Sequence, residues 1–398
     1  MSAGEEAASS PGRLHILTLT PFYPTATDDA NGCFVAEPLT ALSKLGVVHS
    51  IFSGAPVYRK VVPLSSGAPP AQWVRYFAFP GGLGLASSGA FLFSRLLSRV
   101  RGLHARMPID LIHAHGPLPA GHAAMLLQRE LGIPFVVSVH GLDAYADRQV
   151  SGRPGAWCRR VSRLVFQSAD RVVCISEHVR EQVLRGEASS KTSVVYNGAD
   201  PGMFLPLSEV VAGSPSSNPQ KIVSVGNLIP TKGHELLLRA VAALSAKYPS
   251  LVCEIVGDGP LGERLGSLAR ELKLSERVRF LGRKSRTEVA ALLRTATLFA
   301  LPSSYEGLGC VYLEAMASGT PAIGCLGQGI EEIIHHGRDG WLVKPNDLDD
   351  LVHGLATLLE NDQLRELIAT QGRKTVLQTF TIAHQAQRLL RIYRECTS

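Results

Sequence analysis

Two glutamates, Glu306 and Glu314, enclose seven residues that combine a glycine-rich loop with the start of a predicted helix. Gly307 and Gly309 lie in this loop, which follows a predicted strand at 298–301. Free N–H groups at the start of a helix bind anions, and carboxylates accept hydrogen bonds from hydroxyl groups. Together they favour a site for a sugar attached to phosphate, such as a nucleotide sugar. Taken alone, Glu306 could merely offset the helix dipole.

Two further segments carry polar residues after predicted strands. Gly226 and Asn227 end one strand, and Lys232 follows in the turn, where a flexible ammonium group could reach a phosphate. His140 ends a buried strand, so it should point toward the crevice, and Asp143 comes three residues later. Each feature also has an ordinary explanation, namely a solvated lysine beside a turn and a structural histidine.

The N-terminal half offers weaker candidates. Gly32, after Asn31 in the first loop, could allow a phosphate to approach the backbone closely, although this is also ordinary turn chemistry. His113 and His115 share one face of a predicted strand. No suitably placed carboxylate pair accompanies them, so we predict no metal site. His115 should line the cleft or be structural.

A Gly-x-Gly-x-x-Gly motif at Gly257, Gly259 and Gly262 follows one predicted strand and precedes a helix, as in dinucleotide-binding folds. The next strand ends in a Gly-Arg-Lys sequence that includes Arg283, without the acidic residue that would hold a ribose 2′-hydroxyl. A nicotinamide cofactor is therefore disfavoured.

The composition of the 398-residue chain is that of a globular protein with reduced thiols. Hydrophobic residues make up 45%, enough for large cores. The seven cysteines are scattered and form no C-x-x-C pair, which indicates a cytosolic protein without disulfides or a zinc site. The start of the chain is typical of a disordered tail, and no apolar run approaches the roughly 18 residues of a membrane span. A net charge of +6 fits anionic ligands or an anionic membrane but is too diffuse to indicate nucleic acid.

Strand-like and helix-like segments alternate along the chain, which predicts an α/β fold with parallel sheets. A Pro-, Ser- and Gly-rich stretch separates two doubly wound, Rossmann-like domains that face each other across a cleft. The helix after Glu306 is expected at 308–318, ended by Gly319. The predicted divisions are a disordered tail at 1–11, an N-terminal domain at 12–205, a linker at 206–219, a C-terminal domain at 220–377 and a final helix at 378–398.

The segment Phe91–Arg106 repeats arginines at roughly helical spacing beside apolar residues. It could form an interfacial helix drawn to anionic lipid. It could equally form a helix that packs an apolar stripe on the sheet and exposes a basic face to solvent.

Several motifs together resemble the retaining family-4 (group 1) glycosyltransferases of GT-B fold, across nearly the whole chain. The motifs are the string 306–314, Tyr-Asn-Gly-Ala-Asp at 196–200, Val-Gly-Asn and Lys-Gly within 225–233, Val-Gly-Asp-Gly-Pro at 256–260, and 327–332. The block at 225–235 further resembles transferases of teichuronic-acid and polysaccharide biosynthesis. The resemblance implies that the last helix crosses back to the N-terminal domain.

The resemblance also implies roles for individual residues. Glu314 would hold the donor ribose, while three catalytic candidates would lie at the reacting centre: Glu306 facing the transferred sugar, Lys232 on the diphosphate, and His140. Arg283 would lie beside the base. The other donor-binding candidates are Gly32, Gly226, Asn227, Gly307, Leu308, Gly309 and Cys310. The candidate acceptor contacts are Asn31, His115, Asp143 and Tyr145.

We therefore expect retaining transfer of a hexose-type sugar from a UDP or GDP sugar to an acceptor hydroxyl, with no cofactor and no metal. Lys232 and backbone donors would stabilise the leaving diphosphate. The departing phosphate would take the acceptor proton during front-face attack. Asn227 departs from the family, which commonly has arginine there, and an amide cannot replace a charged, bidentate group. Either Lys232 acts alone, or an arginine elsewhere assists.

Other interpretations stay open. The same two-domain plan could support a sugar-nucleotide epimerase, a phosphorylase, or a binding protein without turnover. The expected partners are the donor and an acceptor hydroxyl on a sugar, a lipid-linked sugar or a small molecule. The pathway would be polysaccharide, glycolipid or glycoconjugate synthesis. We expect a cytoplasmic protein, with peripheral contact to an anionic membrane as a further option.

Overall fold

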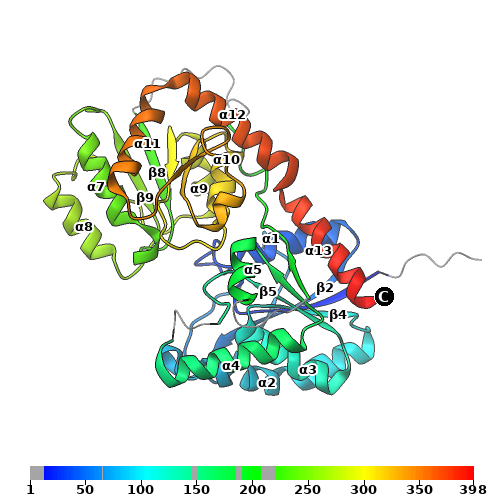
Figure 1. The fold of residues 1–398 in the computed structure, drawn as a ribbon. Coiled ribbons are helices and arrows are strands. Elements are labelled where there is room, and N and C mark those ends of the chain that lie inside the picture. The colour runs from blue at the N-terminus through cyan, green and yellow to red at the C-terminus, as the bar shows by residue number, and fades with distance from the viewer. Residues whose placement is uncertain (1–12, 65, 146–149, 185–190, 208–219) are drawn as a thin grey trace, which may run out of the picture.

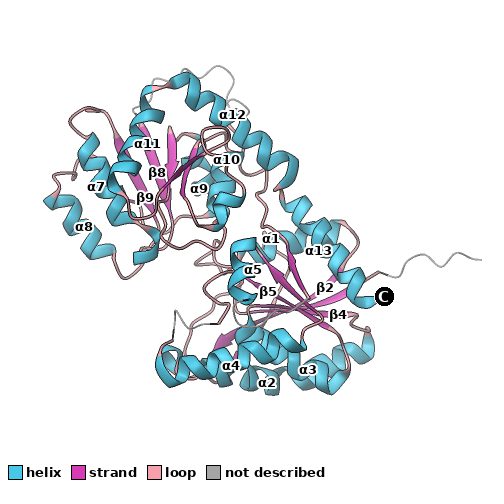
Figure 2. Cartoon of the chain, in the orientation of Figure 1, coloured by secondary structure: helices cyan, strands magenta, loops and turns pink. Residues whose placement is uncertain are grey.

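A computed structural model describes residues 13–64, 66–145, 150–184, 191–207 and 220–398 (Figure 1). The predicted tail at 1–11 and most of the predicted linker at 206–219 lie outside these residues. Two parallel sheets, each covered by helices, form the two halves of the chain (Figure 2). The predicted fold class, two doubly wound α/β sheets, is confirmed.

The N-terminal sheet contains seven parallel strands in the order β3-β2-β1-β4-β5-β6-β7. The central strands β1, β4 and β5 are buried along their whole length, because helices cover both faces. The strands are β1 His15–Thr20, β2 Val48–Pro56, β3 Gln72–Tyr76, β4 Leu111–His115, β5 Phe135–Val139, β6 Arg171–Cys174 and β7 Thr192–Val194. The helical segments are α1 Cys33–Lys44, η1 Pro80–Gly82, α2 Leu85–Arg106, η2 Pro117–Gly121, α3 His122–Leu131, α4 Gly152–Ser168 and α5 Glu177–Leu184.

The C-terminal sheet contains six parallel strands in the order β10-β9-β8-β11-β12-β13. The strands are β8 Lys221–Val225, β9 Val252–Val256, β10 Val278–Phe280, β11 Leu298–Ala300, β12 Ala322–Cys325 and β13 Trp341–Val343. The helical segments are η3 Pro230–Lys232, α7 His234–Leu244, α8 Gly262–Glu271, α9 Arg286–Arg294, α10 Cys310–Ala317, η4 Gly329–Glu332, α11 Leu348–Glu360, α12 Asp362–Thr379 and α13 Ile382–Thr397.

The order of strands reverses beside β1 in the first sheet and beside β8 in the second. In open α/β sheets, ligands bind beyond the carboxyl ends of the strands at such a point. Gly32 follows β1, Lys232 follows β8, and Glu306 follows β11. The two sheets therefore direct these predicted site residues toward the region where the domains meet.

The chain returns to the N-terminal domain through α13, as the resemblance implied (Figure 1). The predicted start of the final helix at residue 378 is wrong, because α12 continues to Thr379 and α13 begins only at Ile382. Thr381 is the N-cap of α13, because its side chain accepts the backbone N–H of His384. Tyr393 of α13 is fully buried against α1 and the N-terminal sheet.

Two other predicted helices differ in extent. The helix after Glu306 begins at Cys310, two residues later than expected, because Gly309 adopts a positive φ of 80°. The segment Phe91–Arg106 belongs to the longer helix α2, which buries Leu92 and Leu96 on the sheet. Those side chains are therefore not available to a membrane. Among the described helices, none is both long and apolar enough to cross a membrane.

Candidate active site

The glycine-rich loop of the C-terminal domain lies against the carboxyl ends of β5 and β6 in the N-terminal domain. The Ser176 hydroxyl donates a hydrogen bond of 2.6 Å to the carbonyl oxygen of Gly307. A Cβ atom at position 307 would lie 2.9 Å from the carbonyl oxygen of His140. A side chain at position 307 would therefore force the two domains apart, and glycine allows this close approach.

Lys232 and Glu306 form an ion pair, with 2.5 Å between Nζ and Oε2. Their side chains are only 19% and 11% exposed. The backbone N–H of Glu306 donates to the side-chain oxygen of Gln328 at 2.8 Å, which fixes the position of the loop. The ammonium group has three donors, so two remain that a phosphate could accept. The structure thus brings together two residues that the sequence analysis placed at the reacting centre.

The start of α10 adjoins this pair. Leu308 is fully buried, and a Cβ at Gly309 would lie 2.6 Å from the ring of Tyr312, so the turn needs glycine. Burial raises the pKa of the Cys310 thiol to about 12, and its sulfur accepts a hydrogen bond from Asn197 at 3.2 Å. Cys310 is therefore a neutral thiol, and its contribution to anion binding would come from the backbone.

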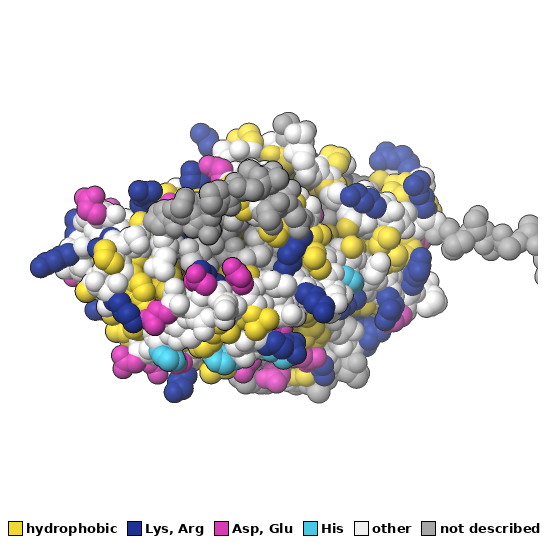
Figure 3. Space-filling model, turned by 90° about the horizontal axis from the view of Figure 1, so that it is seen from above, with side chains coloured by type: hydrophobic (Ala, Val, Ile, Leu, Met, Phe, Trp, Pro, Cys, Tyr) yellow, Lys and Arg dark blue, Asp and Glu magenta, His cyan; other side chains and the backbone are white. Residues whose placement is uncertain are grey.

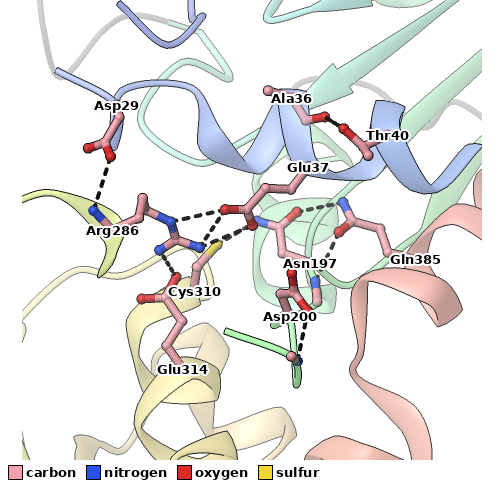
Figure 4. Close-up of polar contacts among 12 residues, drawn as sticks. Asp29, Ala36, Glu37, Thr40, Asn197, Asp200, Arg286, Cys310, Glu314 and Gln385 are labelled. Carbon is pink, nitrogen blue, oxygen red and sulfur yellow. Dashed lines mark hydrogen bonds and ion pairs between the residues drawn. The ribbon is translucent and has the colours of Figure 1, made fainter. Parts of the chain in front are cut away.

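Glu314 is held by Arg286, a residue that sequence reasoning missed (Figure 4). The same guanidinium donates to Glu37 of α1 through Nε at 3.0 Å and through Nη2 at 2.8 and 3.0 Å. It also lies 4.8 Å from the ring centroid of Phe204. One arginine thus connects the predicted ribose-binding carboxylate to the N-terminal domain.

Arg286 occupies the first position of α9, where the positive end of the helix dipole disfavours a cation, and the two carboxylates offset this repulsion. Its backbone N–H donates to Asp29 at 3.2 Å. The neighbouring Arg283 pairs with Asp28 and lies 3.8 Å from Asp258. Both arginines therefore bind the first loop of the N-terminal domain.

His140 belongs to a buried group of histidines at the ends of β4 and β5. Its Nε2 lies 3.1 Å from Nδ1 of His115, while His113 bonds to Tyr393 and Ser138, both at 2.7 Å. Burial lowers the pKa of His140 to about 3, so the ring is neutral near pH 7. Within the described residues, Nδ1 of His140 is buried and has no hydrogen-bond partner.

The predicted acceptor residues make contacts within the N-terminal domain. Asp143 accepts the backbone N–H of His140 at 2.9 Å, and burial raises its pKa to about 6. Tyr145 donates to the carbonyl oxygen of Val183 at 2.7 Å. The backbone N–H of Asn31 donates to Asp28 at 3.1 Å. These contacts fix the loops around the cleft, and a role in binding an acceptor stays a prediction.

The other predicted donor contacts lie on the turns after β1 and β8. Gly32 precedes α1 with a φ of 78°, and a Cβ there would overlap the backbone of Phe22. A Cβ at Gly226 would lie 3.6 Å from Cδ of Lys232, so this turn adjoins the lysine stem. Asn227 is exposed on the same turn.

Glu332, within a motif that the sequence analysis noted without assigning a role, joins the domains at a second place. Its carboxylate accepts the backbone N–H groups of Glu177 at 2.8 Å and His178 at 2.7 Å, in the first turn of α5. Tyr305, beside the glycine loop, donates to Gln182 of the same helix at 2.8 Å. A carboxylate at a helix start is favoured by the helix dipole.

In the described part of the chain, no group of three or more His, Cys, Asp or Glu residues is arranged to hold a metal.

Comparisons with known proteins agree with this architecture. Residues 34–202 match the model of Glycosyltransferase Family 4, and residues 211–375 match that of Glycosyl transferases group 1. A D-inositol 3-phosphate glycosyltransferase from Nocardioides sp. is 31% identical over 410 aligned residues, covering 95% of this chain and 88% of that protein. An uncharacterized glycosyltransferase from Methanocaldococcus jannaschii is 28% identical over 267 residues, covering 67% of this chain and 70% of that protein.

Solved structures show the same fold. Sucrose-phosphate synthase from Thermosynechococcus elongatus superimposes with a TM-score of 0.79 at 22% identity, covering 96% of this chain and 99% of that one. HepE from Anabaena in complex with UDP-glucose superimposes with a TM-score of 0.74 at 21% identity, covering 96% of this chain and 100% of that one. The two facing sheets and the motifs between them define a sugar-transferring enzyme of GT-B fold. The chain belongs to glycosyltransferase family 4, with a C-terminal domain of the group 1 type.

Proposed function

We propose that this glycosyltransferase moves a hexose-type sugar from a nucleotide diphosphate sugar to an acceptor hydroxyl, with retention of configuration and without a metal. The observation that carries the proposal is the Lys232–Glu306 pair beside the start of α10. Here a cation, free backbone N–H groups and a carboxylate converge at the ends of β8 and β11. This combination suits a diphosphate and the sugar attached to it.

The leaving diphosphate would be stabilised by fixed positive groups. Lys232 retains two N–H donors, and the helix starts at Gly309 and Gly32 contribute backbone N–H groups and the positive ends of two dipoles. Donors that are already in place when charge develops supply a large part of catalysis. With this much positive charge from the protein, the reaction needs no metal.

The carboxylates support front-face attack rather than double displacement. Glu306 is paired with Lys232, and Glu314 with Arg286, so both are held by cations. A covalent mechanism would need one of them free to attack the anomeric carbon. We therefore infer that the departing phosphate takes the acceptor proton. The neutral ring of His140 would contact the transferred sugar.

Two of the similar proteins indicate which donors and acceptors to test first. The HepE complex contains UDP-glucose, so UDP sugars are the first donors to test and GDP sugars the second. The Nocardioides relative is named for an inositol phosphate acceptor. For this chain we propose an acceptor hydroxyl in polysaccharide synthesis, including the teichuronic-acid type, or in glycolipid or other glycoconjugate synthesis in the cytoplasm.

Donor binding is tested by thermal shift with a panel of UDP and GDP sugars. A ligand at 100 times its Kd stabilises the folded state by about 2.7 kcal/mol, so the correct donor should raise the melting temperature by several degrees. Transfer is then measured with that donor in excess EDTA, and the anomeric configuration of the product is read by NMR. An inverted product, or activity that EDTA abolishes and Mn²⁺ restores, would contradict the proposal.

A further inference from the structure

Charge is distributed very unevenly along this chain. Residues 38–109 and 150–169 contain twelve of the 40 Lys and Arg residues and none of the 34 Asp and Glu residues. The rest of the chain therefore has 28 basic and 34 acidic residues, a net charge of −6, although the whole chain carries +6. A basic region on an otherwise acidic protein indicates an anionic partner.

Helices α2 and α4, which come from these two segments, pack side by side on one face of the N-terminal sheet (Figure 1). Each buries an apolar stripe and directs arginines outward. The exposed arginines include Arg95, Arg99 and Arg106 on α2 and Arg153, Arg160 and Arg163 on α4. We call this surface the basic face. The face of the molecule seen in Figure 3 differs, because acidic and basic side chains are interspersed there.

An aromatic cluster adjoins the basic face where α2 begins. It consists of Phe77, Phe79 and Phe91, which are 47%, 54% and 39% exposed. The Phe77 ring lies 5.0 Å from that of Phe79 and 5.4 Å from that of Phe91, between centroids. Leu83, in the same connection, is 64% exposed. Large apolar side chains that gather on a surface mark a contact with a partner or a membrane.

The cluster is continuous with α4. A Cβ at Gly82 would lie 2.7 Å from Val150, just before that helix. Ala86 of α2 packs in one buried group with Cys158 of α4. Trp157, the neighbour of Cys158, is 49% exposed. Apolar anchors and arginines thus occupy one connected surface of the N-terminal domain.

We propose that this surface docks on an anionic lipid bilayer. The aromatic cluster, Leu83 and Trp157 enter the interfacial region, and the arginines of the basic face bind headgroup phosphates. Since the apolar stripe of α2 is buried, the helix does not lie in the membrane by itself. The cluster at its first turns and the arginines along it make the contact.

Charge is what selects a bilayer surface as the partner. Each Lys or Arg near an anionic membrane contributes about 1 kcal/mol, or roughly a fivefold change in partitioning. The surface extends along α2 and α4, and its anchors lie at one end, beyond the carboxyl end of β3. That end of the sheet also carries the cleft, so a docked protein would have its cleft close to the membrane.

The test is co-sedimentation of the full chain with vesicles of equal parts phosphatidylglycerol and phosphatidylcholine at low salt. The wild type should bind these vesicles at low salt and dissociate from them at high salt. It should not bind vesicles of phosphatidylcholine alone. Phe79→Ser with Leu83→Ser should weaken binding about tenfold or more. Arg95→Glu with Arg99→Glu should weaken it at least about 25-fold.

Two substitutions in the C-terminal domain serve as matched controls. Leu367→Ser removes an apolar side chain that is 51% exposed on α12, and Lys374→Glu reverses a charge exposed on the same helix. Both should bind as the wild type does. The proposal is overturned if the wild type fails to bind, or if controls and test variants lose binding equally. A concentration-dependent dimer that Phe79→Ser abolishes, without vesicle binding, would instead assign the surface to a second copy. The assay contains no sugar donor, so its outcome is independent of the proposed transfer reaction.

Discussion

Arg286 of the C-terminal domain forms a bidentate ion pair with Glu37 of the N-terminal domain, with N···O distances of 2.8 to 3.0 Å. The same guanidinium holds Glu314, so one cation serves two carboxylates from different domains. The three side chains are between 5% and 22% exposed. Burial raises the pKa of the Glu37 carboxyl above its usual value, and the charge of Arg286 opposes this rise.

The first prediction is that this ion pair holds the cleft closed. Glu37→Ala leaves Arg286 without one of its carboxylates, and breaking a buried pair costs about 3 kcal/mol, or roughly 100-fold in the population of open molecules. Small-angle scattering should therefore show a larger radius of gyration. Glu235→Ala, which breaks a surface pair with Arg239 inside one domain, should leave the radius unchanged. An unchanged radius in Glu37→Ala would show that other contacts close the cleft.

The second prediction concerns donor affinity. If Glu314 binds the ribose hydroxyls, Glu314→Ala removes hydrogen bonds to a charged group that are worth about 1.5–3 kcal/mol each. The Kd for the donor, measured by calorimetry, should rise by about tenfold or more. Glu314→Gln keeps an acceptor oxygen and should recover part of the affinity. Equal binding of the donor by all three proteins would remove Glu314 from the site.

The third prediction separates turnover from binding. Lys232→Ala removes a fixed donor at the leaving diphosphate, and the loss of one such donor typically lowers kcat by about 100-fold or more. Glu306→Ala should also lower kcat, because it removes both the sugar contact and the partner that positions Lys232. Full activity in the Lys232→Ala, Glu306→Ala double variant would contradict the assigned chemistry.

The sequence predicted the parts of the site that a local pattern encodes. The strand ends, the glycines of the loop and the pair of glutamates each follow from short motifs. Arg286 and Glu332 could not be assigned in the same way, because their partners Glu37 and Glu177 are far away in the sequence and meet them only when the domains close. The start of α10 was placed too early because Leu308 is apolar enough for a helix, whereas Gly309 turns the chain.

The fourth prediction is that acid destabilises the N-terminal domain through its buried histidines. Burial lowers the pKa of both His113 and His140 from 6.5 to about 3. Between these values the unfolded chain binds protons that the folded chain does not, so stability is present above pH 6.5 and is lost as the pH falls. Burial raises the pKa of Asp143 to about 6, so this one carboxyl has the opposite effect and stabilises the folded state as the pH falls. Each of these three groups contributes up to about 1.4 kcal/mol per pH unit, so the two histidines together outweigh Asp143.

The measurement is the melting temperature at pH 7.5 and at pH 5.0. The wild type should melt at a clearly lower temperature at pH 5.0, and His113→Gln should show a smaller difference because one buried group no longer titrates. His113→Gln also removes the hydrogen bond to Tyr393, so its absolute stability should fall at both pH values, and only the difference between them tests the prediction. His353→Gln replaces an exposed histidine of α11 and should retain the full difference. If all three proteins respond equally to pH, the buried histidines are not what makes the fold sensitive to acid.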